Sequence, residues 1–462
     1  MPESMAETCS CSSSRTFSWL VKSCLPDPTP THPAPRRPDP HLLLSRPGNK
    51  APPPLPSRHR RHDTEADADC DPAPSLSSLP DDLLLECLCR VPLSSLPALS
   101  FVCRRFSHLV DSPLFLRLRR SHGLLRRSLY ALSISDTGHA LVLSSPTPLL
   151  AGAVWEPPRS SAVLPLPVGV FDGGFSHCRL VPIGRFVYAI GRNVAICYDT
   201  WREKATPISP TLFPRKKFAA ASVAGKIYVA GGSSKTSAVE EYDPVTDSWR
   251  VVAEAPRRRY GCVGAATDGV FYVIGGLKVG GRWEAPRGGR LDAHTCAGTI
   301  DLYDVEARAW LRSRAVPGGG CIVGACAAGG RLYVLASHAV ELSFWGWDGT
   351  AATRRSRKRS GDGCDWARLP TPPVPQQARV GGAGRFACVG VGDSTVVLLV
   401  HISIPSSTNS SVCAGGDAGR RGTRSFDKEG FVLVYDAIAG EWNRGKELPP
   451  ALWRAACTCV EC

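Results

Sequence analysis

The stretch "PRRRYGCVGAATDGVFYVIGG" at residues 256–276 decides the fold, because its pattern also occurs in "PRKKFAAASVAGKIYVAGG" at residues 214–232. In each copy an aromatic residue begins an apolar strand, a turn follows, and a second apolar strand ends at a glycine pair, Gly231–Gly232 or Gly275–Gly276. Self-similarity at a spacing of a few tens of residues is the sequence signature of propellers and related repeat folds. The two copies therefore predict successive blades of antiparallel β-sheet.

The residues that follow each copy also repeat. "EEYDPVTDSWRVVAEAP" (240–256), "DLYDVEARAWLRSRAVP" (301–317) and "LVYDAIAGEWNRGKELP" (433–449) share one spacing between a Tyr-Asp pair and a tryptophan. The tyrosine–tryptophan pairs are Tyr242/Trp249, Tyr303/Trp310 and Tyr435/Trp442. We expect each tryptophan to pack between neighbouring blades and each aspartate to open a turn. The glycine pairs are expected to allow close backbone approach. These are structural roles, without a ligand.

Weaker copies of the same pattern complete a ring. The predicted blades cover residues 128–167, 175–209, 214–256, 257–317, 318–375 and 378–450. The first of them lacks its opening strand, and "PALWRAACTCVEC" (450–462) resembles such a strand, which we place at 451–461. Pairing it into the first blade would remove an exposed sheet edge. Residues 128–462 are therefore predicted to form a six-bladed β-propeller, so the fold is mainly β.

A helical period precedes the repeats. In "SSLPDDLLLECLCRVP" (77–92), Leu84, Leu88 and Val91 fall on one face of a helix. Two further helices are expected over 97–111 and 112–120, so residues 75–127 are predicted to form a small three-helix domain. Such a domain has a very small core. It carries more leucine than three short helices can cover, which favours an apolar face that a partner completes.

Composition limits the remaining interpretations. Residues 1–74 are rich in Pro, Ser and Arg and are predicted to be a disordered tail. Two short runs, "RRSRKR" (354–359) and "GRRGTR" (419–424), supply eight of the fourteen net positive charges, so a nucleic-acid surface is not expected. No apolar run is long enough to predict a membrane span. The nineteen cysteines are scattered and are expected to be reduced.

The segment "LPDDLLLECLCRVPLSSLPALSFVCRRFSHLVDSPLF" (79–115), together with the glycine pairs and the Tyr-Asp to Trp spacing, resembles plant F-box/kelch-repeat proteins. The resemblance implies that the helices bind a Skp-type adaptor, and through it a cullin ubiquitin ligase, while the propeller binds the protein to be ubiquitinated. The positions that it assigns to the adaptor are Leu79, Pro80, Leu84, Leu88, Val91, Leu99, Val102 and Cys103. One departure is that a tryptophan common in the family is here Phe115 or Leu116.

Substrate contacts are expected on long loops that a rigid scaffold holds. Inserts at 277–299 and 404–429 join second to third strands and should share a face, whereas the insert at 349–365 should leave the opposite one. The candidate substrate-binding residues are Arg282, Trp283, Arg287, Arg290, His294, Arg420, Arg421 and Arg424. The run "RRSRKR" is open to three readings: a nuclear signal, an acidic-partner patch or a solvated loop. We expect the protein in the cytoplasm, the nucleus or both.

Two alternatives to a ligase adaptor stay open. One is a passive kelch scaffold whose helices pack on the propeller, and the other is a kelch metal-dependent enzyme. The enzyme is disfavoured because the histidines fall in separate blades and no catalytic constellation stands out. A zinc site is disfavoured because such sites usually need two cysteine pairs brought together. We therefore expect no catalytic residue, no metal and no cofactor.

Overall fold

The computed structural model describes eleven stretches of the chain, and the structural statements below concern these residues. They are residues 76–134, 139–147, 154–157, 163–165, 177–279, 296–338, 341–348, 366–375, 384–405, 426–453 and 455–461. The predicted tail at 1–74 lies outside the described residues.

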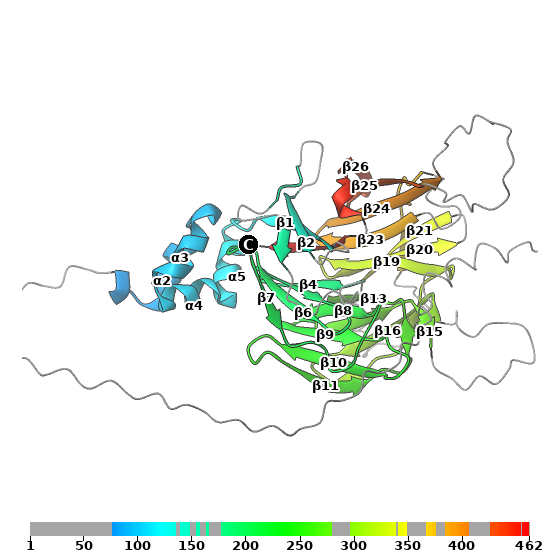
Figure 1. Ribbon diagram of the computed structural model, residues 1–462, viewed down its shortest axis with the longest axis horizontal. Helices are drawn as coiled ribbons and strands as arrows, with labels where there is room; N and C mark the ends of the chain where they lie inside the picture. Colours follow the sequence, from blue (N-terminus) through cyan, green and yellow to red (C-terminus); the bar gives the residue numbers. More distant parts are fainter. Residues whose placement is uncertain are drawn as a thin grey trace, which may run out of the picture.

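Six antiparallel sheets form a ring, so the predicted six-bladed β-propeller is confirmed (Figure 1). The inner strands contact one another in the cyclic order β27, β4, β8, β13, β19, β23. From the axis outward, the first blade contains β27 (Ala456–Glu461), β1 (Arg127–Ile134), β2 (His139–Pro146) and β3 (Val163–Pro165). The second contains β4 (Arg179–Ile183), β5 (Phe186–Ile190), β6 (Ala195–Asp199) and β7 (Lys204–Ile208). The third contains β8 (Ala219–Val223), β9 (Lys226–Ala230), β10 (Ala238–Asp243) and β11 (Ser248–Glu254).

The other three blades follow the same plan. The fourth contains β13 (Val263–Thr267), β14 (Val270–Ile274), β16 (Thr299–Asp304), β17 (Ala309–Trp310) and β18 (Arg314–Ala315). The fifth contains β19 (Cys321–Ala328), β20 (Arg331–His338), β21 (Glu341–Asp348) and β22 (Trp366–Leu369). The sixth contains β23 (Gly384–Val391), β24 (Thr395–Pro405), β25 (Phe426–Asp436) and β26 (Glu441–Glu447). A short ladder of β12 (Arg259–Tyr260) and β15 (Leu277–Lys278) accompanies the fourth blade. Apolar clusters fill the spaces between adjacent blades.

The two ends of the propeller sequence meet in the first blade. Strand β27 pairs antiparallel with β1, in a register that runs from Arg127 opposite Glu461 to Leu132 opposite Ala456. The C-terminal strand thus supplies the inner position that the first blade lacks. Because β27 also contacts β4 and β23, this pairing completes the ring.

Each repeated tryptophan links its blade to the preceding one. Its indole NH donates to a backbone carbonyl at the end of that blade: Trp249 to Ser209 at 2.8 Å, Trp310 to Glu254 at 2.7 Å and Trp442 to Pro370 at 2.7 Å. Each indole also lies 5.0–5.2 Å, between ring centroids, from its tyrosine, which is directly opposite on the next strand inward. The aspartates after Tyr242, Tyr303 and Tyr435 accept backbone NH groups in the turns that follow.

The glycine pairs lie where neighbouring blades approach each other. All four glycines have positive φ, and a Cβ atom on Gly231 would come within 2.7 Å of the Arg259 carbonyl oxygen. A Cβ atom on Gly276 would lie 2.9 Å from the backbone of Cys262 and Tyr260. Gly275 similarly faces Ile322 of the next blade at 3.0 Å. A larger residue at Gly231 or Gly275 would collide with the neighbouring blade, and one at Gly276 would collide with the start of its own blade.

Buried arginine–carboxylate pairs stabilise the third and fourth blades. Arg215 donates to Glu240 at 2.7 Å and to the carbonyls of Gly231 and Ala238, and both charged side chains are fully buried. Arg259 binds Asp301 in the same way in the next blade. Each arginine therefore joins the start of a blade to its second and third strands.

The N-terminal helical unit (residues 76–124) has four α-helices, so the expected set of three was wrong. They are α2 (Asp81–Leu88), α3 (Leu96–Val102), α4 (Arg104–Val110) and α5 (Pro113–Ser121), with 3₁₀ turns at Leu76–Ser78 and Leu93–Ser95. The helix expected over 97–111 breaks at Cys103, whose extended backbone (φ −158°, ψ 165°) ends α3. The Cys103 thiol then accepts the Phe106 NH at 3.4 Å, as an N-cap of α4.

The helical unit is docked on the first two blades. Arg185, in the turn between β4 and β5, lies between the rings of Phe186 and Trp201 and pairs with Asp199 and with Asp111 at the end of α4. A second contact lies at the closing strand, where Glu461 accepts from Arg120 of α5 and from Arg127 of β1, each at 2.7 Å. We call these two contacts the latch.

The latch defines the two faces of the ring. The helical face carries the turn between β4 and β5 and the turn between β6 and β7, both of which contact the helical unit. The far face carries the starts of the inner strands and the links from second to third strands, because neighbouring strands are antiparallel. The described strands that flank the inserts 277–299 and 404–429 are second and third strands, so both inserts begin and end on the far face.

We predict that Arg215→Gln destabilises the propeller by about 3–5 kcal/mol, because the buried Glu240 carboxylate would keep only the Leu212 NH as a partner. Chemical denaturation followed by tryptophan fluorescence measures the loss. Arg312→Gln, which changes an exposed arginine, is the control and should cost less than about 0.5 kcal/mol. Equal midpoints for the two variants would show that the buried pair does not stabilise the blade.

We predict that the Glu461 contact of the latch loses its stabilising contribution in acid. Burial alone would raise the pKa of Glu461, but hydrogen bonds from Arg127 and Arg120 outweigh it and hold this pKa below its ordinary value of 4.5. A depressed carboxyl pKa contributes stability above pH 4.5, and that contribution is lost as the pH falls through the folded-state value. Glu461→Gln should therefore flatten the acid limb of the melting temperature against pH. The exposed-residue control Glu447→Gln should retain it, and identical acid limbs in both variants would contradict the assignment.

Candidate functional site

The helical unit has an internal core of its own. Its buried members are Leu84, Leu85, Leu88, Cys89, Leu96, Leu109, Val110 and Phe115. Arg119 of α5 crosses beneath this core and donates to the carbonyls of Cys89 and Val91 at 2.8 Å, which ties α5 to the end of α2. The helical unit therefore has a packed core without a partner protein.

This core corrects the expectation that the leucines of α2 form a partner face. Leu84 is 1% exposed and Leu88 is 5% exposed, so their side chains fill the helical core. Leu79, Val91 and Leu99 are half-buried. Of the eight positions assigned to the adaptor, only Pro80, Val102 and Cys103 are exposed. The surplus of leucine was overestimated, because four helices and Trp201 of the propeller cover more surface than three helices would.

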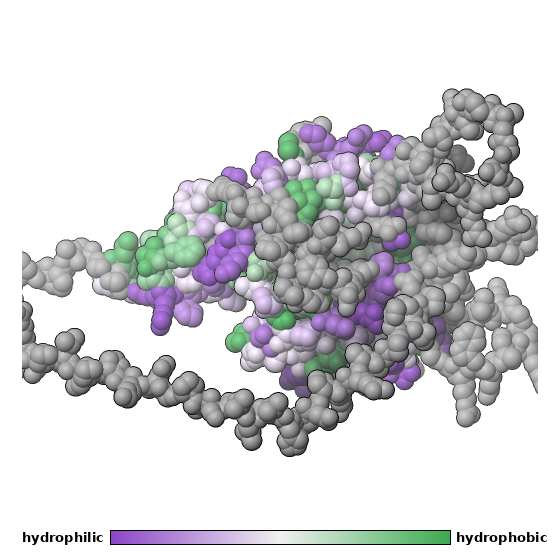
Figure 2. Space-filling model, in the orientation of Figure 1, coloured by the Kyte–Doolittle hydropathy of each residue, from purple (hydrophilic) through white to green (hydrophobic). Residues whose placement is uncertain are grey.

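A different set of apolar side chains lies on the surface of the helical unit. Leu83 of α2 is 51% exposed, and Phe101 and Val102 at the end of α3 are 69% and 63% exposed. Leu76 and Leu114 complete this set, which we call the exposed apolar set. Figure 2 shows apolar surface over the helical unit, at the left of the view. Single exposed apolar residues are common on proteins, but five of them within one small helical unit make it a candidate binding surface.

The sequence missed Leu83 and Phe101, and one signal would have found Leu83. In "DDLLLECL" the three consecutive leucines cannot all face one core, because a helix places successive residues about 100° apart. Leu84 and Leu85 are turned inward, so Leu83 is turned outward. The sequence also missed the latch, since Arg185 carries no local signal of its contact with Asp111.

The candidate substrate-binding residues cannot be placed. Arg282, Trp283, Arg287, Arg290 and His294 lie outside the described residues, as do Arg420, Arg421 and Arg424. Only the strand ends on either side of their inserts are described. These ends lie on the far face, away from the helical unit.

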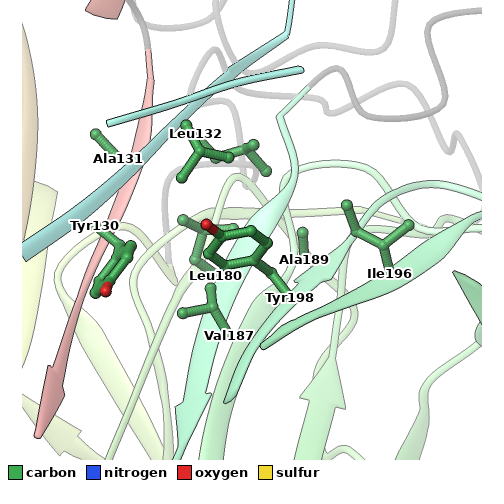
Figure 3. A pocket seen from close by; sticks show the side chains of 9 residues that line it. Tyr130, Ala131, Leu132, Leu180, Val187, Ala189, Ile196 and Tyr198 are labelled. Carbon is green, nitrogen blue, oxygen red and sulfur yellow. The ribbon is translucent and has the colours of Figure 1, made fainter. Parts of the chain in front are cut away.

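The described pockets do not have the character of an active site. A cavity of ≈ 20 Å³ between the first two blades is lined by apolar residues and tyrosines, including Leu132, Leu180, Val187 and Tyr198 (Figure 3). It has room for no more than about one water molecule. An open groove of ≈ 820 Å³ runs beside Trp155 and β26, lined by apolar residues and prolines and by charged residues such as Lys446 and Glu447.

Within the described part of the chain, one group of side chains has ligand spacing for a metal ion. Ligand atoms of Glu86, Cys89 and His122 lie within 4.8 Å of one another. Glu86, however, already binds Arg90 at 2.8 Å, and that bond lowers the pKa of its carboxyl. Burial raises the pKa of the Cys89 thiol, which disfavours the thiolate that a metal requires. The chemistry of these residues does not fit a metal site.

None of the described helices alone is long and apolar enough to cross a membrane. Asp81–Leu88 and Leu93–Val102 reach that length and apolarity only together, and this pair is bent by 116°.

Comparison with known proteins gives matches in both parts of the chain. A family model described as F-box domain matches residues 76–118, and one described as Kelch motif matches residues 214–256. The first match covers α2, α3 and α4 and most of α5, and the second covers the third blade. The solved structure of YjhT aligns with 59% of this chain and 84% of its own, at 17% identity and a TM-score of 0.42.

One curated relative covers nearly the whole chain. An F-box/kelch-repeat protein of Arabidopsis thaliana is 48% identical over 464 residues, which span 99% of this chain and 100% of the relative. A second F-box/kelch-repeat protein of the same plant is 30% identical over 224 residues, or 44% of this chain and 55% of that relative. With an F-box helical unit, a kelch ring and a relative matched from end to end, this chain belongs to the F-box/kelch-repeat protein family.

Proposed function

We propose that this protein is the substrate-recognition adaptor of a Skp–cullin–F-box ubiquitin ligase. The F-box helices bind a Skp-type adaptor, and the kelch propeller binds the protein to be ubiquitinated. The protein performs no chemistry itself and works in the cytoplasm, the nucleus or both. The observation that carries the proposal is the exposed apolar set, which lies on an F-box whose own core is already complete.

The energetics of such a contact are favourable. Burying a Leu, Val or Phe side chain that is now in water contributes about 1.5–3 kcal/mol. A few such side chains in the groove of a partner supply the hydrophobic centre of an interface. Because Leu84 and Leu88 support the helices from inside, they shape this surface without forming it.

The latch fixes the position of the helical unit relative to the propeller of this protein. It holds the helical unit to the first two blades through Arg185, Asp111 and Glu461, all at the helical face. A protein bound on the far face would therefore be held at a defined position relative to the ligase. Such positioning suits a protein whose task is to present a captured chain for ubiquitin transfer.

We predict that Leu83→Asp and Val102→Asp each weaken binding of a purified Skp-type adaptor by roughly tenfold or more, since each places a carboxylate in an apolar interface. Isothermal titration with the full-length chain measures the affinity, and circular dichroism verifies the fold. Val245→Asp is the matched control, because Val245 is 93% exposed in a propeller turn. Leu84→Asp is not a suitable probe, since it would disrupt the helical core.

Two outcomes would contradict the proposal. If the wild-type chain does not bind the adaptor, the passive kelch scaffold becomes the better interpretation. If Leu83→Asp and Val102→Asp both bind as tightly as Val245→Asp, the exposed apolar set is not the adaptor surface.

A further inference from the structure

Basic side chains gather around the axis of the ring on its far face. His177 comes two residues before β4, Lys216 and Lys217 come just before β8, and Arg385 is the second residue of β23. All three strands are inner strands that begin on the far face. We call this group, together with Arg179 of β4, the basic mouth.

The basic mouth is held in place by contacts between blades. The Arg179 guanidinium donates to the carbonyl of Phe218 at 2.7 Å and to that of Cys262 at 2.9 Å, and so joins the second, third and fourth blades. The Lys217 ammonium lies 5.8 Å from the centre of the Tyr260 ring, and the Lys217 carbonyl accepts the Gly261 NH at 2.9 Å. These cations are carried by the rigid rim of the ring.

The pKa of His177 reflects the charges around it. Burial is the largest cause that lowers its pKa, to about 4, and Lys217, Lys216, Arg385 and Arg179 lower it further. The charges among these causes are all positive, and Lys216, Lys217 and Arg385 also make contacts within the protein. His177 and Lys217 also have positive φ, 62° and 55°, which non-glycine residues rarely adopt. The local backbone is constrained where the cations meet.

We infer that the basic mouth binds an acidic segment of the protein that the ligase captures, through carboxylate or phosphate groups. The inference rests on the proposed function and deepens it, because it names the chemistry of the bound segment. The cations converge on one point of the far face. A nucleic acid would instead need a track of cations with stacking aromatic rings along it.

The position of the basic mouth suits this role. The helical unit occupies the helical face, so a segment on the far face does not compete with the adaptor. Several cations at the starts of inner strands favour an anionic segment through charge-assisted hydrogen bonds and raise its rate of association.

The test is fluorescence anisotropy of the full-length chain with labelled peptides. The probes are an oligoglutamate peptide, a phosphoserine peptide of the same length and an oligoglutamine peptide, and a single-stranded DNA oligonucleotide is a further arm. We expect one or both acidic peptides to bind, with an affinity that falls as salt rises, and the glutamine peptide not to bind. The comparison of carboxylate with phosphate identifies the preferred anion.

Charge reversal locates the site. Lys216→Glu/Lys217→Glu should weaken acidic-peptide binding roughly tenfold or more, and the milder pair Lys216→Gln/Lys217→Gln should weaken it less. The matched control is Arg368→Glu/Lys446→Glu, which reverses two exposed charges on outer strands of other blades and should change the affinity little. Circular dichroism verifies that all three variants are folded.

The inference is overturned if the wild-type chain binds neither acidic peptide, if both lysine pairs bind like the control pair, or if the oligonucleotide binds more tightly than the peptides. Adaptor binding by the same variants separates this inference from the proposed function. A chain that binds the adaptor but no acidic peptide refutes only the basic mouth. A chain that binds the peptides but no adaptor refutes the ligase function, and with it the identity of the bound segment as a ligase substrate.

Discussion

The backbone hydrogen bonds between β27 and β1 are the constraint on which the rest of the molecule depends. They join the last described strand of the chain to the first strand after the helices, and they leave no open edge between the first and last blades. Glu461 at the end of β27 also binds Arg120 of the F-box. One strand therefore closes the propeller and fixes the position of the helical unit.

The closed ring has two faces with different chemistry. The helical face carries the F-box, whose exposed apolar side chains suit a hydrophobic contact with a folded partner. The far face carries the basic mouth and the ends of two long inserts, which suit a charged and variable partner. The buried Arg215–Glu240 and Arg259–Asp301 pairs hold strands together within their blades, and the tryptophans join adjacent blades, so the ring that carries both faces is rigid. The proposed division between ligase binding and substrate binding follows from that rigidity.

Much of the fold was predictable because its determinants repeat. Glycine pairs and the spacing between tyrosine and tryptophan reflect local needs of a blade, so they recur in the sequence and mark three of the blades. Weaker copies of the same pattern indicated the rest of the six. The pairing of the C-terminal strand with β1 could also be expected, because an incomplete blade and an unpaired strand lie at opposite ends of the propeller sequence. Contacts that occur once left no such signal. The break at Cys103 arises from one extended residue in an otherwise helical pattern, and the Arg185–Asp111 contact joins two domains. For the site, hydrophobic periodicity identified α2 but assigned Leu84 to a partner, because periodicity alone does not distinguish an internal core from an interface.

The most direct test is hydrogen exchange of the full-length chain with and without a Skp-type adaptor, read by mass spectrometry. We expect the adaptor to protect peptides from α2 and α3, around Leu83 and Val102, and to leave the peptides around Lys216 and Lys217 unchanged. Protection confined to the far face, or no change in the helices at saturating adaptor, would contradict this expectation.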